Sequence, residues 1–432
     1  MRFIITKIRY RLVKLKMEYG CIGEKLGHSF SKEIHNALAD YEYSLKELKR
    51  TELPEFFKNK KFKAINVTIP YKQDVIEYLD WISAEAKEIN AVNTIVNKDG
   101  RLYGYNTDFS GLKALIDREN VSLKGKRVVV LGSGGTSNTA FAVANYMEAQ
   151  TVLKVSRNKK DGYITYNELY EKYSDCEIII NTTPCGMYPK TGTSAVDLNK
   201  LPKVEAVFDA VYNPLKSKLI LDAEKKNITA VGGLYMLVSQ AAYAVEKFID
   251  VTVDSRKVED IFQNLYKQKM NIALVGMPAS GKTSVGKVLS EKLDKAFVDS
   301  DEEIVKREKR TIPEIFSQNG ESYFRNVEKS VIKDISMLNS QVISTGGCAV
   351  LSCKNIENLI GNARVYFLDR PLEMLVTTSD RPLSSNNEDL KKRYDERYEL
   401  YKASADVIVD GSKTVEEVAK IIEEDFYEYS CN

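Results

Sequence analysis

Two glycine-rich turns, each directly after a short apolar run, constrain the fold of this chain more than any other feature. One turn occupies residues 132–137 after the run 128–131, and the other occupies residues 276–283 after the run 272–275. A buried strand, a glycine turn and a helix in this order are typical of α/β proteins with parallel sheets. The two turns differ in motif and are therefore unrelated modules rather than an internal repeat. We expect at least two α/β domains.

Further apolar runs extend this organisation over the whole chain. They are separated by helix-length intervals and include residues 64–69, 177–180, 206–209 and 365–368. The 432 residues correspond to roughly three domains of ordinary size. A polar stretch ends at Lys269 and a new strand is predicted from Asn271, so we expect a domain boundary there with almost no linker.

Composition excludes several classes of protein. The 63 Lys and Arg against 61 Asp and Glu leave a net charge of +2, so no overall field favours nucleic acid or an anionic membrane. No stretch approaches the ~20 apolar residues of a membrane span. The 6 cysteines show no CxxC or zinc-ligand spacing, and there are only 2 histidines. We expect a cytoplasmic protein that acts on small molecules, and its oligomeric state stays open.

The first 16 residues are basic and lack any acidic residue. They could form a transit peptide or a surface-seeking helix. A start at Met17, directly before the strand predicted over 19–23, favours instead an upstream extension. We therefore treat residues 1–16 as a basic N-terminal extension outside the fold.

The first glycine turn has the features of a dinucleotide-binding turn. Gly132 permits the tight bend, and Gly134 lets the backbone approach a pyrophosphate. The helix predicted over 138–147 offers free N–H groups at its N-terminus. Ser137 replaces the third glycine of the motif and is small enough for close packing. For this motif alone, a plain turn is the alternative interpretation.

The end of the next predicted strand bears on the choice of cofactor. An NAD enzyme places Asp or Glu there to bind the ribose hydroxyls, whereas this chain has Ser156, Arg157 and Asn158. A guanidinium can bind a 2′-phosphate bidentately, and a carboxylate would repel it. The pattern predicts NADP, with a solvated surface role for Arg157 as the alternative.

Polar residues also gather at four predicted strand or turn ends before this turn, at 27–31, 66–72, 91–94 and 106–108. Their hydroxyls, amides, one ammonium and one carboxylate suit a polyol acid. Lys72 and Asp108 could form an acid–base pair, because a partly desolvated lysine can titrate in a working range. The alternatives are Ser31 as the N-cap of a helix over 32–39, a solvated Lys72, and Asp108 capping the following helix.

Together with the motifs at 181–187, 209–214 and 232–240, these clusters resemble shikimate dehydrogenase over residues 17–267. The resemblance implies NADPH-dependent reduction of 3-dehydroshikimate, with Lys72 as the proton-transfer residue paired with Asp108. The substrate-binding residues that it implies are Ser29, Ser31, Thr68, Asn93, Asp108, Tyr212 and Gln240. The cofactor-binding residues are Gly132, Ser133, Gly134, Gly135, Thr136, Ser156, Arg157, Asn158 and Gly233.

This chain departs from that family at two positions. Lys32 stands where the family usually has proline after the second serine, which bears on Ser31. Asn158 stands where the family usually has threonine. The charge that selects NADP is kept, but one hydroxyl donor is lost, so the strictness of the cofactor preference stays open.

The second glycine turn matches the phosphate-binding pattern GxxxxGK[ST] in full. Backbone N–H groups of such a loop bind phosphates, Lys282 reaches the β- and γ-phosphates, and the Thr283 hydroxyl joins the Mg²⁺ shell. Apolar residues at helical spacing follow over 285–293 and predict the helix whose N-terminus the phosphates need. The predicted ATP-binding residues are Ala279, Ser280, Gly281, Lys282, Thr283 and Ser284.

Two carboxylates, Asp299 and Asp301, end the next predicted strand. Residues two apart on an extended strand project to the same side, so both are expected to face the phosphate site. One could serve Mg²⁺ and the other could accept a proton from a substrate hydroxyl. The alternative is that Asp301 begins a helix as its N-cap.

Separate arginines and a glycine pair complete the C-terminal pattern. Arg325, Arg381 and Arg397 are spread along the chain with Gly346–Gly347 between them, which suits a small carboxylate better than nucleic acid. As a set with the phosphate loop they resemble shikimate kinase over 270–427. The resemblance implies phosphoryl transfer from ATP to the 3-hydroxyl of shikimate. It assigns shikimate to Asp301, Arg325, Gly346, Gly347 and Arg397, ATP also to Arg381 from a closing lid, and Mg²⁺ to Thr283 and Asp299. Cys348 replaces the family's third glycine, so the form of that turn stays open.

The sequence thus predicts a bifunctional enzyme in which the dehydrogenase product is the kinase substrate. The expected domains are a substrate domain over 17–118 completed by helices from 236–268, a Rossmann NADP domain over 119–235, and a P-loop domain like those of nucleoside monophosphate kinases over 270–428. One alternative is an NAD-dependent quinate/shikimate dehydrogenase joined to a kinase with another acceptor. Another is a metabolite-sensing regulator built from decayed enzyme domains, which the presence of Lys72, Asp108 and Lys282 disfavours.

Overall fold

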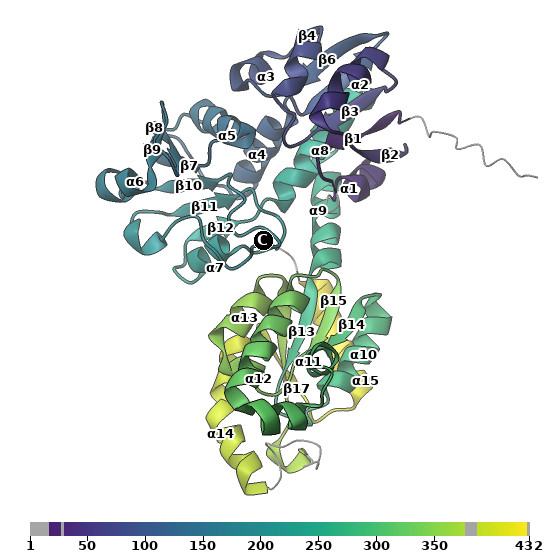
Figure 1. The fold of residues 1–432 in the computed structure, drawn as a ribbon, viewed down its shortest axis with the longest axis vertical. Helices are drawn as coiled ribbons and strands as arrows, with labels where there is room; N and C mark the ends of the chain where they lie inside the picture. Colours follow the sequence, from purple (N-terminus) through teal and green to yellow (C-terminus); the bar gives the residue numbers. More distant parts are fainter. Residues whose placement is uncertain (1–16, 27–29, 376–386, 430–432) are drawn as a thin grey trace, which may run out of the picture. The chain divides into compact units, whose positions relative to one another are not determined.

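The computed structural model describes residues 17–26, 30–375 and 387–429. Figure 1 draws the chain as a ribbon with its helices and strands labelled. By its internal contacts, the chain divides into two compact units. The first unit comprises the residues up to Ala114 together with Leu237–Val258. The second comprises Leu115–Met236 together with Glu259–Asn432. Within the described residues, no helix has the length and apolar character that crossing a membrane requires.

The first unit is built on a six-stranded sheet in the order β2-β1-β3-β5-β6-β4. Its strands are β1 (Tyr19–Gly23), β2 (Tyr43–Glu47), β3 (Ala64–Val67), β4 (Trp81–Ile82), β5 (Thr94–Lys98) and β6 (Arg101–Tyr105). β5 pairs antiparallel with β3 and β6, and the other pairs are parallel. The helices are α1 (Ser31–Leu38), α2 (Leu53–Asn59), α3 (Ala84–Ile89), the start of α4 (Thr107–Arg118) and most of α8 (Leu234–Ile249).

The central strands of this sheet are buried because they are apolar on both faces. All residues of β3 are buried, and Ile22, Ile65 and Ile95 are fully enclosed in the core. The predicted strand over 64–69 ends at Val67, since Thr68 begins a turn. Ser31 is the first residue of α1 rather than its N-cap, which is Phe30.

The second unit contains two separate parallel sheets. The first sheet has the order β12-β11-β10-β7-β8-β9, in which β7 and β10 lie side by side at the centre. Its strands are β7 (Arg127–Leu131), β8 (Thr151–Ser156), β9 (Ile164–Thr165), β10 (Ile178–Asn181), β11 (Ala206–Asp209) and β12 (Thr229–Val231). Numbered along the chain, this is the order 3-2-1-4-5-6 of a Rossmann fold. The predicted Rossmann fold is confirmed.

Three helices accompany this sheet: α5 (Gly135–Tyr146), α6 (Tyr166–Lys172) and α7 (Lys218–Glu224). The prediction that the helix after the glycine turn begins at residue 138 is wrong by one turn. α5 begins at Gly135 with Gly134 as its N-cap, because the glycines themselves enter the first helical turn. The helix N-terminus therefore lies directly at the turn.

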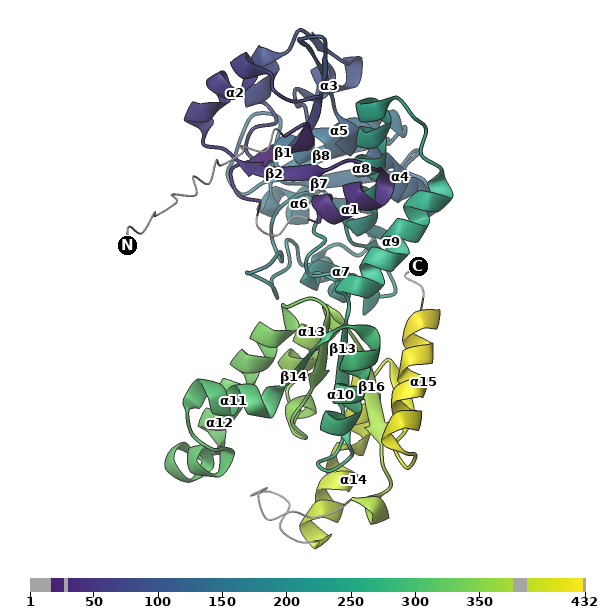
Figure 2. The ribbon, with the colours of Figure 1, turned by 90° about the vertical axis from the view of Figure 1, so that its right-hand side faces the viewer.

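The other sheet has the order β14-β15-β13-β16-β17 and is parallel throughout. Its strands are β13 (Asn271–Val275), β14 (Ala296–Asp299), β15 (Gln341–Ser344), β16 (Ala363–Asp369) and β17 (Val407–Asp410). The helices are α10 (Lys282–Leu293), α11 (Ser300–Glu308), α12 (Ile312–Ser336), α13 (Cys353–Ile360), α14 (Asn387–Ser404) and α15 (Val415–Glu428). In Figures 1 and 2 these helices lie on both faces of the sheet, as the α/β prediction requires.

The helix α9 (Ser255–Lys269) leads into the last sheet with Met270 as the single residue before β13. The predicted absence of a long linker is therefore confirmed. α9 is amphipathic and buries Val258, Phe262 and Leu265 on one side. The polar stretch that ends at Lys269 belongs to the last turns of this helix. Its polar composition therefore does not indicate a loop.

Candidate active sites

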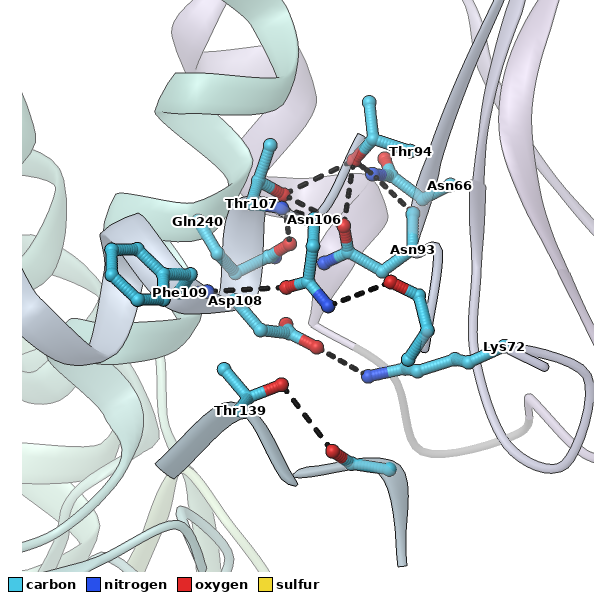
Figure 3. A network of polar contacts seen from close by, with 12 residues as sticks. Asn66, Lys72, Asn93, Thr94, Asn106, Thr107, Asp108, Phe109, Thr139 and Gln240 are labelled. Carbon is cyan, nitrogen blue, oxygen red and sulfur yellow. Dashed lines mark hydrogen bonds and ion pairs between the residues drawn. The ribbon is translucent and has the colours of Figure 1, made fainter. Parts of the chain in front are cut away.

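Lys72 and Asp108 form an ion pair in the first unit (Figure 3). The Lys72 Nζ lies 2.5 Å from Asp108 Oδ2, and the two side chains are 14% and 11% exposed. Lys72 follows β3, where its carbonyl accepts from the backbone N–H of Val92 at 2.8 Å. Asp108 lies in the first turn of α4. The ammonium is thus held next to a carboxylate and remains partly accessible, as a proton-transfer group must be.

A buried amide and hydroxyl network surrounds this pair. Asn93 Oδ1 accepts from the Thr107 backbone N–H at 2.7 Å and from the Thr94 hydroxyl at 3.0 Å. The Thr107 hydroxyl lies 3.4 Å from Gln240 Oε1 on α8. Asn66 donates to Thr94 Oγ1 at 3.1 Å, so the network joins β3, β5, α4 and α8 (Figure 3). Shared bonds of this kind fix the side chains in single orientations.

Sequence reasoning did not assign Asn66, Thr94 or Thr107 as site residues, although they lie in the polar clusters that it recognised. All three are buried. They contact Asn93 or its neighbours rather than open space, so they position the assigned residues. The sequence could have indicated these positions, because each is a polar residue near a predicted strand end and close to an assigned residue.

The other predicted substrate residues are placed as follows. Thr68 is half-buried at the end of β3, and its backbone N–H donates to the Ile22 carbonyl at 3.0 Å. Ser31 is half-buried at the start of α1. Tyr212 follows β11 in the second unit. Ser29 lies outside the described residues.

The turn after β7 leaves space for a ligand at one glycine. Gly132 has φ +120°, and a Cβ there would lie 2.6 Å from Thr182 Oγ1. A Cβ on Gly134 would meet nothing within 4 Å. Ser137 is fully buried and donates to the Gly132 carbonyl at 2.7 Å, which closes the turn. The open face at Gly134 and the N-terminus of α5 fit a dinucleotide pyrophosphate.

The residues after β8 present a cation and no carboxylate. Arg157 is exposed, and Ser156 donates its hydroxyl to the Asn158 carbonyl, which fixes the bend. These residues fit the 2′-phosphate of NADP. Gly233 approaches the Ala210 backbone so closely that a Cβ would lie 2.4 Å from the Ala210 carbonyl oxygen. That contact alone requires glycine at this position.

The phosphate loop after β13 has the backbone that its motif predicts. Gly276 and Gly281 have φ +152° and +91°, and Ala279 between them has φ +67°. Lys282 is 7% exposed and donates to the carbonyls of Gly276 at 2.9 Å and Met277 at 2.8 Å. The lysine thus folds back over its own loop, at the N-terminus of α10, where a phosphate group fits.

Thr283 and Asp299 bring two oxygen donors together beside this loop. The Thr283 hydroxyl donates to Asp299 Oδ2 at 3.0 Å. Hard oxygen ligands, few in number and next to a phosphate site, suit Mg²⁺, which keeps most of its waters. Among the described residues, no group of three or more His, Cys, Asp and Glu side chains could hold a metal ion. The hydroxyl of Thr283 and the carboxylate of Asp299, side by side next to the phosphate loop, fit Mg²⁺ shared with a nucleotide.

Asp301 reaches the same cavity as Asp299, but by a different route from the predicted one. The expectation that both aspartates lie on an extended strand is wrong, because β14 ends at Asp299 and α11 begins at Ser300. Asp299 is the N-cap of α11 and accepts from the Asp301 backbone N–H at 3.0 Å. Asp301 lies in the first helical turn, and both aspartates line the cavity.

This cavity, of ≈ 390 Å³, joins the phosphate loop to a cluster of charged side chains. Gly346 and Gly347 line it after β15, and Arg325 on α12 and Arg397 on α14 line it from two helices. Of the predicted kinase residues, Ala279, Gly281, Lys282, Thr283, Ser284, Asp299, Asp301, Arg325, Gly346, Gly347 and Arg397 line the cavity. Ser280 is buried behind the loop, and Arg381 lies outside the described residues.

The structure adds residues that sequence reasoning did not assign. Glu328, Arg393, Phe316 and Phe324 line the same cavity. Glu328 is 2% exposed and ion-pairs with Arg325 at 3.1 Å. Burial raises the pKa of Glu328, and the nearby Arg325 opposes that rise. The sequence could have indicated Glu328, because a carboxylate three residues after Arg325 lies on the same face of a helix.

Comparisons with known proteins match both the N-terminal and the C-terminal part of the chain. The family model described as shikimate dehydrogenase substrate binding domain matches residues 21–95, and the model described as shikimate kinase matches residues 278–426. The shikimate dehydrogenase (NADP(+)) of Clostridium perfringens strain 13 is 40% identical over 265 residues, which cover 57% of this chain and 97% of the relative. That of Clostridium beijerinckii is 38% identical and covers 58% and 99%.

The chain belongs to the shikimate dehydrogenase family. Its C-terminal part is a shikimate kinase domain, so the protein is a bifunctional enzyme of shikimate metabolism. A chorismate mutase/shikimate 5-dehydrogenase fusion protein from Clostridium acetobutylicum has the same fold as the shikimate dehydrogenase part, with a TM-score of 0.55 and 37% identity over 57% of this chain and 96% of that one. Shikimate dehydrogenase 1 from Peptoclostridium difficile follows with a TM-score of 0.54 and 33% identity over 57% and 97%.

Proposed function

We propose that this chain reduces 3-dehydroshikimate to shikimate with NADPH and phosphorylates the 3-hydroxyl of shikimate with ATP. The observation that carries the proposal is that two families sharing one metabolite match adjacent parts of one chain. The two activities would then be successive, with the product of the first as the substrate of the second. A shikimate dehydrogenase structure from Thermus thermophilus, 25% identical, is described as a complex with NADP(H) and shikimate, which supports the cofactor assignment.

The reduction requires one hydride and one proton. Residues 132–136, 156–158 and Gly233 would hold NADPH, which would supply the hydride for the carbonyl carbon. The Lys72 ammonium donates its proton to the carbonyl oxygen, which becomes the hydroxyl of shikimate, and the ion pair with Asp108 holds Lys72 in place. Ser29, Ser31, Thr68, Asn93, Tyr212 and Gln240 would bind the remaining hydroxyls and the carboxylate.

The phosphorylation requires a deprotonated hydroxyl and a neutralised phosphate. ATP with Mg²⁺, when bound, supplies the γ-phosphoryl group. The residues of the phosphate loop bind its phosphates, Thr283 and Asp299 hold Mg²⁺, and Arg381 would contact the nucleotide. Arg325 and Arg397 bind the acceptor carboxylate, and Asp301 accepts the proton of the attacking hydroxyl. Gly346 and Gly347 would line the acceptor site with their backbone.

A pair of variants with opposite effects tests both assignments in the full-length protein. Lys72→Ala should lower kcat for 3-dehydroshikimate reduction by about 10²–10⁴-fold, while leaving phosphorylation of added shikimate intact. Lys282→Ala should lower the kinase kcat by about 10²-fold or more, while leaving the reduction intact. NADPH absorbance, ADP release and the phosphorylated product are followed in one assay. The proposal fails if neither substitution changes its own activity.

The same assay separates the alternative dehydrogenase. An NAD-dependent quinate/shikimate enzyme would prefer NADH and would oxidise quinate. The exposed Arg157 and the lack of a carboxylate after β8 favour NADPH instead. A higher kcat/KM for NADH than for NADPH would exclude the proposed cofactor preference, and a kinase that ignores shikimate would exclude the proposed acceptor.

A further inference from the structure

In the glycine turn after β15, the positions 346, 347 and 348 differ in whether a side chain fits. A Cβ on Gly346 would lie 2.4 Å from Asp301 Oδ1, and a Cβ on Gly347 would lie 2.7 Å from the Pro278 ring. Both positions therefore require glycine for space. Cys348, the next residue, has φ −106° and ψ 0°, so its backbone does not need the positive φ that favours glycine. The backbone of this turn leaves the third position free for a side chain.

The Cys348 side chain contacts Arg397. The Arg397 guanidinium donates from Nη1 to Cys348 Sγ at 3.2 Å, and Arg397 is only 7% exposed. One turn further along α14, the buried Tyr401 hydroxyl donates to the Gly347 carbonyl. Two successive turns of α14 are thus attached to two successive residues of the glycine turn. The sulfur accepts directly from the guanidinium, which also interacts with the Tyr401 side chain.

The same sulfur also acts on the second arginine of the cavity. Burial would lower the pKa of Arg325, but the Cys348 sulfur and the Glu328 carboxylate outweigh it, and the pKa is raised. Arg325 is otherwise held by Glu328 at 3.1 Å and Glu321 at 2.9 Å. Cys348, Arg325 and Arg397 all line the cavity, and the sulfur contacts the Arg397 guanidinium directly.

We propose that Cys348 is a positioning residue of the kinase acceptor site. Its sulfur holds the Arg397 guanidinium in one place, and its side chain narrows the cavity beside Gly347, so a small cyclic carboxylate binds in one orientation. This inference rests on the proposed kinase function. It concerns binding of the acceptor and not the transfer step, because Cys348 is not among the groups that hold phosphate or Mg²⁺.

Four full-length variants test this role. Cys348→Gly and Cys348→Ala remove the acceptor of the Arg397 bond and should raise KM for shikimate about five- to tenfold, the range expected for one ordinary hydrogen bond, because sulfur is a weak acceptor. The kinase kcat and KM for ATP should stay within about twofold. Cys348→Ser keeps an acceptor atom and should restore most of the shikimate affinity. Cys353→Ser, at an exposed cysteine outside the cavity, is the matched control and should behave as wild type.

The outcomes separate this inference from the proposed function. An unchanged KM for shikimate in both Cys348→Gly and Cys348→Ala would overturn the positioning role. A parallel loss of kcat and of ATP affinity would assign Cys348 a merely structural role and would overturn it as well. Dehydrogenase activity of each variant, measured in the same preparation, reports that the chain is folded.

If the wild-type protein phosphorylates no shikimate, the proposed kinase function fails, and a second measurement decides on Cys348. Iodoacetamide labelling of Cys348 and Cys353 is followed by mass spectrometry with and without shikimate. Protection of Cys348 alone would support its place in the acceptor cavity. Equal labelling of Cys348 in both conditions would overturn the inference independently of turnover.

Discussion

Two glycines of the turn after β7 differ in what a methyl group would meet. At Gly132, φ is +120° and a Cβ would clash with Thr182 at 2.6 Å, so the protein itself requires glycine. At Gly134, φ is −91° and a Cβ would meet no protein atom within 4 Å. The space beside Gly134 is therefore free for a bound cofactor. The role of each glycine follows from its surroundings and not from its place in the motif.

Gly134→Ala should separate cofactor binding from folding. The new methyl group occupies space that the pyrophosphate would use, and KM for NADPH should rise about tenfold. The free energy of unfolding should fall by less than about 1 kcal/mol, the cost of a poorer N-cap. Steady-state kinetics and urea denaturation measure the two quantities. An unchanged KM for NADPH would contradict the placement of the cofactor at this turn, whereas Gly132→Ala should destabilise the fold.

His35 is a buried histidine that makes the first unit sensitive to acid. It stacks on Tyr43 at 3.9 Å between ring centroids, and its Nδ1 lies 2.7 Å from the Tyr41 hydroxyl. Burial lowers the pKa of His35 from 6.5 to about 3. Between these values the unfolded chain binds a proton that the folded chain does not. The free energy of unfolding should therefore fall as the pH drops from 6.5 towards 3, by at most about 1.4 kcal/mol per pH unit.

Urea denaturation at pH 7, 6 and 5 measures this slope. Trp81 is the single tryptophan and lies in β4 of the first unit, so its fluorescence reports on that unit. His35→Phe keeps the aromatic stack and removes the titrating group. Carboxylates contribute equally to both proteins, so the difference between the slopes belongs to His35. Identical slopes in the two proteins would refute the assignment.

At the scale of elements, Lys295 of the kinase domain forms hydrogen bonds with the C-terminal end of α9. Its Nζ donates to the carbonyls of Lys267 at 3.0 Å, Gln268 at 3.1 Å and Met270 at 2.8 Å. The first two carbonyls belong to the last turn of α9, where no further N–H of the helix can satisfy them, and the third directly follows the helix. Lys295 is 6% exposed, and burial lowers its pKa to about 8. One buried ammonium therefore replaces the missing helical hydrogen bonds.

Lys295→Met should destabilise the kinase domain by about 2–4 kcal/mol, because three carbonyls lose a charged donor while the apolar volume is kept. Urea denaturation followed by loss of kinase activity measures the change. Lys292→Met is the matched control, since Lys292 is half-exposed and pairs only at the surface with Glu423 at 2.7 Å. The control should shift stability by less than about 1 kcal/mol. Equal effects of the two substitutions would contradict the capping role.

At the scale of the whole molecule, the order of strands in each sheet places the functional turns. β7 and β13 each lie inside a parallel sheet, and each is followed by a glycine turn at its carboxyl end. In open parallel sheets, ligands bind at that edge. The near-neutral net charge of +2 gives no long-range field that attracts anions, and the proposed anion-binding groups, Lys282 and the N-termini of α5 and α10, are local.

The sequence by itself determined the fold class, the strands and the two glycine turns of this protein, because these depend on local apolar periodicity and on backbone freedom at named glycines. The sequence also allowed the pairing of Lys72 with Asp108 to be stated as a hypothesis, because both residues belong to polar clusters at predicted strand or turn ends. The start of α5 at Gly135 was not, because helix ends depend on bonds that composition leaves undecided.

Only the tertiary structure decided which distant side chains share a cavity. Asp301 reaches the kinase site from a helix rather than from a strand, and Glu328 and Arg393 line the cavity although neither belongs to a recognised motif. The contact of Arg397 with Cys348 joins residues 49 positions apart. Such contacts arise when helices pack on a sheet, and the spacing of residues along the chain carries no record of that packing.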